Sequence, residues 1–464
     1  MLRFFKQYYP LRNILFFMVE GAVIFSSVLI ASIILTRSTS FLFDLTLVLR
    51  IALVTLVCQI SLYYNDLYDF QVASTVSEIS IRLLHSLGIT AIVLAFIYYF
   101  FPIVIIDRWI FILSILLLMV LIIGWRIIYI HVLNQGIYNE KVLILGSSNL
   151  AVDIYNEIQD KIDCGYTVAA IVPFKSEDSL PDNIPEALIV KTEMSHLCET
   201  IFDLGVKKVI VALRESRGNF PAKELLTCKT AGIDVLEGNS FYELLTGKLL
   251  VTRINPSWLI FSDGFRRSSM GMAIKRLGDI VFSVILIVLL FLPLLIVAFL
   301  IRIDSKGPVL FSQDRVGQHR KKYMMYKFRS MVQDAEKKSG PVWALDNDSR
   351  ITRVGRIIRK FRIDELPQLW NVLKGDMSFV GPRPERKHFT DDLEEKIPYY
   401  GERFVVKPGI SGWAQVSYDY GASVEDAIEK LNYDLFYIKN MSTMFDIMIV
   451  LRTIKTVVFG RGSR

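Results

Sequence analysis

The chain has 464 residues, 52% of them hydrophobic, and a formal net charge of +7. This composition is too apolar for an ordinary soluble protein, so membrane spans are expected, and the length allows about three domains. A basic excess beside long apolar runs more often serves anionic lipid headgroups or phosphate substrates than nucleic acid. Because the sequence carries no nucleic-acid-binding motif, we expect membrane lipid and no nucleic acid as partners.

The first 136 residues hold four apolar stretches, at 13–36, 41–64, 83–106 and 108–131. At ~1.5 Å per residue, each is long enough to cross a hydrocarbon layer of ~30 Å. We therefore predict a four-helix transmembrane bundle over residues 1–136. Basic residues ahead of the first stretch place the N-terminus in the cytoplasm, and an even number of spans returns the chain to the same side.

Three ionisable residues, Glu20, Asp44 and Arg50, fall within these stretches or at their ends. An ionisable group in a span is a functional candidate by default. Interhelical pairing or snorkelling explains these three equally well, so no role is assigned to them.

Residues 137–265 read as a Rossmann-like α/β domain on the cytosolic side. Its first apolar run, 141–145, ends at Gly146 and leads into a helical pattern, and further runs at 168–173, 187–190 and 208–213 predict a parallel sheet. The glycine fingerprint for dinucleotides is incomplete, because Ser148 and Ala151 stand where the second and third glycines belong. A structural or oligomerising domain is therefore favoured over nucleotide binding.

The most apolar segment of the chain is 280–301, which has no charged residue but is interrupted by Pro293. A spanning helix would put the remaining residues outside the cytoplasm, whereas a re-entrant hairpin of two half-helices would keep them inside. The basic excess after residue 302 fits the cytoplasmic side. Proline in a helix interior removes a hydrogen bond, which favours a break here. Periodicity alone leaves the spanning alternative ahead.

The four cysteines are scattered without Cys-x-x-Cys spacing, and the five histidines are not clustered. The sequence therefore predicts neither a zinc site nor a disulfide framework. Any required metal should be a hard cation held by oxygen ligands, for which Mg²⁺ is the natural candidate.

Two adjacent carboxylates, Asp364 and Glu365, lie among the arginines Arg359, Arg362 and Arg383. A carboxylate pair surrounded by cations suits a site for a metal ion and phosphates, with one acid available as a nucleophile or base. Taken alone, the pair is more typical of a solvated charged surface.

Four motifs in the C-terminal region change that balance when they occur together and in this order: Tyr-Lys-Phe-Arg-Ser-Met at 326–331, Asp-Glu-Leu-Pro-Gln at 364–368, Gly-Pro-Arg-Pro-Glu at 381–385 and Lys-Pro-Gly-Ile-Ser-Gly-Trp-Ala-Gln at 407–415. They resemble the bacterial sugar transferase family of polyprenyl-phosphate phosphoglycosyl transferases. The layout is similar to the long form of that family, including members of exosortase-associated exopolysaccharide systems. The resemblance is specific over residues 270–464 and lies in layout alone before them.

The resemblance implies transfer of a sugar 1-phosphate from a UDP-sugar to undecaprenyl phosphate, with release of UMP, as the first step of exopolysaccharide or other surface glycan synthesis. It implies Asp364 as the nucleophile that forms a covalent phosphosugar intermediate, and Glu365 as its neighbour assisting with Mg²⁺ or with proton transfer. Both acids are thus the expected catalytic residues and metal ligands. The expected phosphate-binding cations are Lys327, Arg329, Arg359 and Arg383.

The resemblance also favours the re-entrant course for 280–301. The expected fold is therefore a four-helix transmembrane bundle, a Rossmann-like cytosolic domain and an α-rich phosphoglycosyl transferase domain with a re-entrant membrane helix. The expected location is the bacterial inner membrane, with the catalytic domain, residues 270–464, in the cytoplasm. The bundle and the central domain offer surface enough for a homodimer, and the motifs do not specify the sugar.

Residues 441–459 alternate apolar and charged positions. This pattern suits either an amphipathic helix in the headgroup plane or a buried core helix.

Two other classes of function are the alternatives. A membrane-anchored NAD-dependent nucleotide-sugar enzyme is disfavoured by the incomplete glycine fingerprint. A non-catalytic polysaccharide export scaffold would leave Asp364 and Glu365 unexplained.

Overall fold

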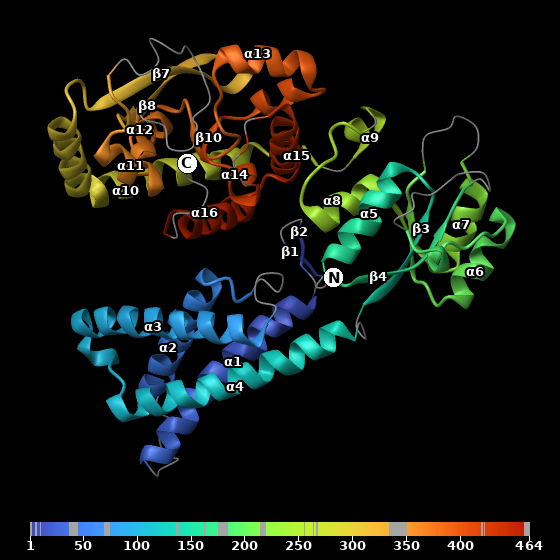
Figure 1. Cartoon of the computed structure of the whole chain (residues 1–464), viewed down its shortest axis with the longest axis horizontal. Helices are drawn as coiled ribbons and strands as arrows, with labels where there is room; N and C mark the ends of the chain where they lie inside the picture. The colour runs from blue at the N-terminus through green and yellow to red at the C-terminus, as the bar shows by residue number, and fades with distance from the viewer. Residues whose placement is uncertain are drawn as a thin grey trace. The chain divides into compact units, whose positions relative to one another are not determined.

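The computed structural model forms two compact units, residues 1–241 and 242–464. It describes residues 2–4, 7–9, 11–36, 45–68, 75–135, 139–161, 164–174, 184–213, 220–254, 256–262, 264–265, 268–333, 350–418, 421 and 423–458. Figure 1 shows the elements with the labels used below.

The first unit opens with a short antiparallel pair, β1 (Leu2–Phe4) and β2 (Gln7–Tyr9), followed by four long helices. These are α1 (Leu11–Thr36), α2 (Leu45–Tyr64), α3 (Val76–Phe100) and α4 (Arg108–Asn134), with a 3-10 turn η2 (Pro102–Val104) between the last two. All four are long and apolar enough to cross a membrane. The third predicted stretch is shifted, since its helix begins at Val76 and stops before Pro102.

A buried ion pair joins α1 to α4. Arg126 donates through Nε to Glu20 Oε1 at 2.9 Å, and its Nη2 lies 2.6 Å from the same oxygen. Both side chains are at most 2% exposed, and Arg126 also donates to the carbonyl of Leu67. Glu20 thus has the interhelical partner that the sequence allowed, whereas Asp44 lies outside the described residues.

The rest of this unit is a parallel four-stranded sheet with helices around it. The strands run in the order β4-β3-β5-β6, with bounds Glu140–Leu145 for β3, Tyr166–Val172 for β4, Lys208–Val211 for β5 and Asp234–Glu237 for β6. The remaining elements are α5 (Asn149–Asp160), η3 (Glu186–Leu188), η4 (Met194–His196), α6 (Leu197–Asp203) and α7 (Ala222–Thr230). The run predicted at 187–190 is not a strand: its first two residues end the 3-10 turn η3, and Ile189 makes a single bridge to Ile171.

The turn after β3 is filled by the end of β5. Gly146 has φ +122°, and a Cβ there would lie 2.4 Å from the carbonyl oxygen of Ala212. The Ser148 hydroxyl donates to the same carbonyl at 2.6 Å. Gly146 therefore allows close packing between the end of β3 and the residue that follows β5.

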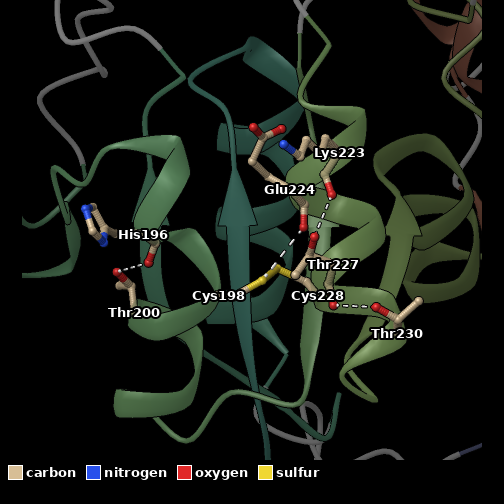
Figure 2. The surroundings of a disulfide bond; sticks show 8 residues. All are labelled: His196, Cys198, Thr200, Lys223, Glu224, Thr227, Cys228 and Thr230. Carbon is tan, nitrogen blue, oxygen red and sulfur yellow. Dashed lines mark hydrogen bonds between the residues drawn. A yellow bond between two sulfur atoms is a disulfide. The ribbon is translucent and has the colours of Figure 1, made fainter.

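A disulfide in the central domain corrects the prediction made from cysteine spacing. Cys198 on α6 and Cys228 on α7 are bonded, with Cα atoms 5.5 Å apart, although 30 positions separate them in the chain (Figure 2). Nothing in their spacing signals the bond, because the pairing depends on two helices lying side by side. Cys58 and Cys164 are buried free thiols.

The second unit contains three groups of elements. The first comprises α8 (Gly238–Thr246), which crosses the unit boundary, α9 (Pro256–Phe261), α10 (Ser269–Asp304), β7 (Leu310–Val316), η5 (Gln318–Arg320) and β8 (Lys322–Phe328). The second comprises α11 (Arg353–Lys360), η6 (Ile363–Glu365), α12 (Gln368–Lys374), β9 (Ser378–Val380) and α13 (Lys387–Lys396). The third comprises η7 (Tyr400–Val405), β10 (Gly409–Ser411), α14 (Trp413–Ser417), α15 (Val424–Asn440) and α16 (Thr443–Val458).

The segment after residue 241 is grouped with this second unit, whereas the sequence predicts that the central domain extends to residue 265. Leu249 and Val251 are buried in one cluster with Trp413, whose indole Nε1 donates to the carbonyl of Gly247 at 2.8 Å. Lys248 pairs with Glu429 of α15 at 2.6 Å. The segment therefore packs on the C-terminal core.

Helix α10 runs unbroken through Pro293 and is not two separate half-helices. Proline costs the hydrogen bond to the carbonyl four residues earlier, and the helix continues on both sides. Its central residues, including Val288, Leu289 and Leu292, are 67–71% exposed. Such an apolar exposed stretch suits lipid contact, and α10 is the fifth helix in the described part of the chain that could cross a membrane.

Helix α16 combines features of both predicted alternatives. Phe445 and Ile449 are buried in the core, whereas Met444, Ile447 and Leu451 are 44–47% exposed. One face therefore packs on the domain, and a second apolar face is open.

We predict that the Glu20–Arg126 pair holds the bundle together. Glu20→Gln or Arg126→Met should lower the free energy of unfolding by about 3–5 kcal/mol, because each leaves an uncompensated charge among apolar helices. The double variant should lose less than the sum of the two, as measured by unfolding in detergent. The lipid-facing control Ile128→Ala, at a residue 61% exposed on α4, should change little. Additive losses would argue against the pair.

Candidate active site

The two acids lie on a short turn between two helices. Arg362 has φ +52°, a left-handed conformation uncommon for residues other than glycine, and it ends the run of α11. The 3-10 turn η6 follows directly and holds Asp364 and Glu365, which are 9% and 7% exposed. Strained backbone of this kind concentrates at functional sites.

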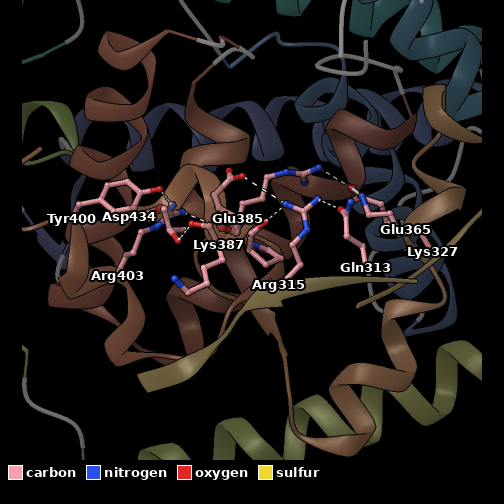
Figure 3. A network of polar contacts seen from close by, with 12 residues as sticks. Gln313, Arg315, Lys327, Glu365, Glu385, Lys387, Tyr400, Arg403 and Asp434 are labelled. Atoms are coloured by element: carbon pink, nitrogen blue, oxygen red, sulfur yellow. Dashed lines mark hydrogen bonds and ion pairs between the residues drawn. The ribbon is translucent and has the colours of Figure 1, made fainter. Parts of the chain in front are cut away.

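Glu365 is held by two cations that come from different parts of the chain. Lys327 Nζ of β8 donates to Glu365 Oε1 at 2.9 Å, and Arg383 Nη2 donates to the same oxygen at 3.0 Å (Figure 3). Burial alone would raise the pKa of Glu365, but Lys327 and Arg383 outweigh burial and lower the pKa below its usual range. Glu365 therefore stays ionised near neutral pH.

Asp364 differs from its neighbour. In the described part of the chain, no hydrogen bond or ion pair engages its carboxylate. Burial raises the pKa of Asp364 to about 6, with Lys327 opposing the shift and the charge of Glu365 adding to it. Two adjacent carboxyls thus have separate properties: Glu365 is a fixed anion, and Asp364 is an uncommitted group that titrates near neutral pH.

The loop that carries Arg383 is anchored through its backbone. Arg403 donates to the carbonyl of Arg383 at 3.0 Å, and Arg315 donates to the carbonyl of Pro384 at 3.2 Å. Arg403 is itself fixed by Asp434, which accepts at 2.8 Å and is 2% exposed. The two flanking prolines and these two guanidinium groups hold Arg383 in place while its side chain stays 38% exposed.

The four cations that are predicted to bind phosphate do not all lie beside the two acids. Lys327 and Arg383 contact Glu365, and Arg359 is close enough to lower the pKa of Asp364. Arg329 is not brought to the acids. Its guanidinium donates to the carbonyls of Ser305 and Lys306, at 2.7 and 3.0 Å, and so caps the end of α10. Arg329 therefore lies at the end of α10, and its expected role in binding phosphate stays a prediction.

Sequence reasoning missed several residues that position the site. Asn371 is fully buried, accepts from Tyr326 N at 3.1 Å and donates to Met324 O at 2.7 Å, which ties α12 to β8. From α10, Arg276 donates to the carbonyl of Val372, and Asp279 accepts from Phe379 N at 3.0 Å. In the sequence, the polar Asn371 among the apolar positions of α12 was a signal that could have identified one of these positioning residues.

Two other polar or aromatic residues near the motifs serve the fold. Trp413 is 4% exposed and belongs to the core. Asp376 follows the left-handed Gly375 in the turn after α12, with Lys374 3.8 Å away.

The described residues contain no group of three or more acidic, histidine or cysteine side chains that could hold a metal ion. Asp364 and Glu365 are the carboxylates adjacent to the predicted phosphate site. Mg²⁺ commonly binds one or two carboxylates together with substrate phosphates and water. The donor set therefore fits a Mg²⁺ ion carried largely by its substrate.

Comparison with known sequences agrees with this geometry. The profile of the family described as bacterial sugar transferase matches residues 270–460, and that of a CoA-binding domain matches residues 63–219. The first matched range contains both acids and the cations around them.

Among curated proteins, a UDP-N-acetylgalactosamine-undecaprenyl-phosphate N-acetylgalactosaminephosphotransferase from Aeromonas hydrophila is 43% identical over 56% of this chain and 62% of its own length. An undecaprenyl-phosphate glucose phosphotransferase from Komagataeibacter xylinus is 33% identical over 70% of this chain and 60% of its own. The chain thus spans about three fifths of these two relatives.

An undecaprenyl-phosphate galactose phosphotransferase from Salmonella typhimurium is 33% identical, over 72% of this chain and 71% of that protein. This match includes residues well before the catalytic motifs, because it covers more of the chain than the C-terminal family profile does. The chain belongs to the bacterial sugar transferase family.

Proposed function

We propose that this protein transfers a sugar 1-phosphate from a UDP-sugar to undecaprenyl phosphate, releasing UMP, as the first step of exopolysaccharide or other surface glycan synthesis. The observation that carries the proposal is Asp364: a buried, uncommitted carboxylate beside a neighbour, Glu365, that two cations keep ionised. The names of the relatives indicate hexose or N-acetylhexosamine donors.

In the first step, an Asp364 carboxylate oxygen attacks the β-phosphorus of the UDP-sugar. A new bond forms between that oxygen and phosphorus, and the bond from phosphorus to the bridging oxygen breaks. UMP leaves, and the sugar phosphate stays on Asp364. Lys327, Arg359 and Arg383 are placed to offset charge on the phosphoryl oxygens.

In the second step, a phosphate oxygen of undecaprenyl phosphate attacks the same phosphorus. The bond to Asp364 breaks and restores its carboxylate, and the product is a lipid diphosphate sugar. Splitting the transfer in two avoids holding two anionic substrates together in one encounter. Glu365 keeps Lys327 and Arg383 in place throughout.

Mg²⁺ fits the site as an additional cation. Asp364 and Glu365 would hold it next to the donor diphosphate, where it would offset negative charge.

The contacts of α10 support a re-entrant course and a cytoplasmic catalytic domain at the inner membrane. Near its start, Arg276 bonds to α12, and near its end Ile301 packs on Phe328 and Ile358. A helix that crossed a membrane would place these ends on opposite sides, yet both contact one domain. We propose that α10 enters and leaves the cytoplasmic leaflet, that α1–α4 span the membrane, and that a homodimer is compatible with this arrangement.

The NAD-dependent alternative is disfavoured by the incomplete glycine fingerprint, in which Ser148 and Ala151 stand in place of the second and third glycines. A non-catalytic export scaffold would not explain why the adjacent carboxyls of Asp364 and Glu365 have different properties.

We predict that Asp364→Asn abolishes turnover, with UMP release falling on the order of 10³-fold or more, because the amide cannot act as the nucleophile. UMP release would be measured in membranes supplied with UDP-sugars, undecaprenyl phosphate and Mg²⁺. Asp376→Asn, which neutralises a nearby turn acid, is the matched control and should keep wild-type activity. Equal activity of Asp364→Asn and the wild type would refute the mechanism.

The rate of the first step should depend on pH through Asp364. Burial raises the pKa of Asp364 to about 6, and the nucleophile must be ionised, so the rate should fall about tenfold per unit below pH 6 and level off above pH 7. Lys327 opposes this shift, so Lys327→Met should move the midpoint to higher pH, and Lys321→Met should not. A midpoint near pH 4 in the wild type would show that Asp364 is not the titrating nucleophile.

A further inference from the structure

One face of α11 is basic, apolar and open at the same time. Arg353, Arg356, Ile357 and Lys360 follow the i, i+3, i+4, i+7 spacing of a single helical face, and all four are exposed. Phe361 continues this face and is 39% exposed, while Ile357 is 59% exposed. We call Arg356, Ile357, Lys360 and Phe361 the α11 face.

The cations of this face have no acidic partner in the part of the chain that the structure describes. No ion pair engages Arg356 or Lys360, and α11 contains no acidic residue. Lys360 Nζ lies 5.8 Å from the centroid of the Phe361 ring. Elsewhere in this unit, exposed lysines such as Lys387 and Lys396 do pair with acids one helical turn away. The α11 face thus presents unpaired positive charge beside exposed apolar side chains.

The opposite face of α11 fixes the helix to the membrane-inserted helix. Ile358 is buried in a cluster with Ile301 of α10, and Val354, Leu294 and Val297 pack against that cluster. The backbone N–H of Val354 donates to Asp304 at the end of α10, at 2.9 Å. The part of α10 that follows Pro293 is therefore the support on which α11 lies.

The same cluster reaches the nucleophile. Ile363, the residue before Asp364, packs against the group formed by Ile301, Phe328 and Ile358. The α11 face ends at Phe361, three residues before Asp364. Helix α11 therefore links α10 to the catalytic turn through its buried face, and its open face ends next to that turn.

We propose that the α11 face binds the polyprenyl phosphate acceptor, with Arg356 and Lys360 on its phosphate and Ile357 and Phe361 on the first isoprene units. The inference rests on the proposed function and extends it by assigning a site to the second substrate. An anion with an apolar tail matches the combination of unpaired cations and exposed apolar groups. A surface that served solvation alone would not need Ile357 and Phe361.

The test separates the two half-reactions of the full-length protein in phosphatidylcholine nanodiscs. Two double variants, Arg356→Gln with Lys360→Gln and Ile357→Ser with Phe361→Ser, alter the face alone. The first half-reaction is followed as the burst of UMP without acceptor, using the UDP-sugar that supports turnover. The second is followed as transfer to undecaprenyl phosphate at increasing acceptor concentration.

We expect both variants to keep the wild-type burst, within about twofold, and to raise the KM for undecaprenyl phosphate about tenfold or more. The first variant loses the contacts of two cations with the phosphate, and the second loses apolar contact with the isoprene units. An intact burst also shows that the variants fold. The matched control, Lys387→Gln with Lys396→Gln on α13, removes two exposed cations and should leave both half-reactions unchanged.

An unchanged KM for the acceptor would overturn the proposal. So would a defect seen only when phosphatidylglycerol is added to the nanodiscs, because the face would then bind lipid headgroups. Absence of any UMP burst in the wild type would overturn the proposed function, and this inference with it.

Discussion

The catalytic region depends on one shared carboxylate oxygen. Oε1 of Glu365 accepts from both Lys327 and Arg383, and so joins β8, the η6 turn and the loop after β9 at a single point. Glu365 is ionised and buried, so its charge must be compensated by both Lys327 and Arg383. These two cations in turn lie close to one another because Glu365 pairs with both. The same arrangement leaves Asp364 uncommitted. The separation of roles between two adjacent acids therefore follows from which of them is paired.

A membrane helix supports this arrangement from both of its ends. Arg276 and Asp279, near the start of α10, hold the ends of α12 and β9, the elements that lead to Arg383. Near its other end, Arg329 caps α10 and Ile301 packs beneath α11. A reaction between a dissolved nucleotide sugar and a lipid requires the nucleophile at the membrane surface. In this fold, α10, the apolar and exposed helix that we propose to contact lipid, is also the helix on which the turn with Asp364 and Glu365 rests.

Sequence reasoning went furthest where the chemistry sits in short motifs. Asp364, Glu365, Lys327 and Arg383 come together as expected, because each lies in a motif whose local turn or strand sets its direction. Arg329 shows the limit. It shares a motif with Lys327 and would share its face in a longer strand, but β8 ends at Phe328, and the Arg329 side chain donates to the residues at the end of α10.

Long-range packing was less predictable. The bond between Cys198 and Cys228 depends on the placement of two helices, and the placement of residues 242–265 depends on partners such as Trp413 and Glu429, far away in the sequence. The strand predicted at 187–190 was an apolar run that makes only one bridge to the sheet. In each case the local sequence was interpreted correctly, as apolar or as lacking a motif. The sequence did not show which distant residues the segment would contact.

The most direct test of the central claim is to detect the phosphosugar on Asp364 itself. The purified protein would be mixed with a UDP-sugar and Mg²⁺ but no acceptor, acid-quenched, digested and analysed by mass spectrometry. The account predicts one sugar phosphate on the peptide that contains Asp364, lost when undecaprenyl phosphate is added before the quench. An enzyme that turns over yet never carries this adduct, or carries it on another residue, would contradict the account.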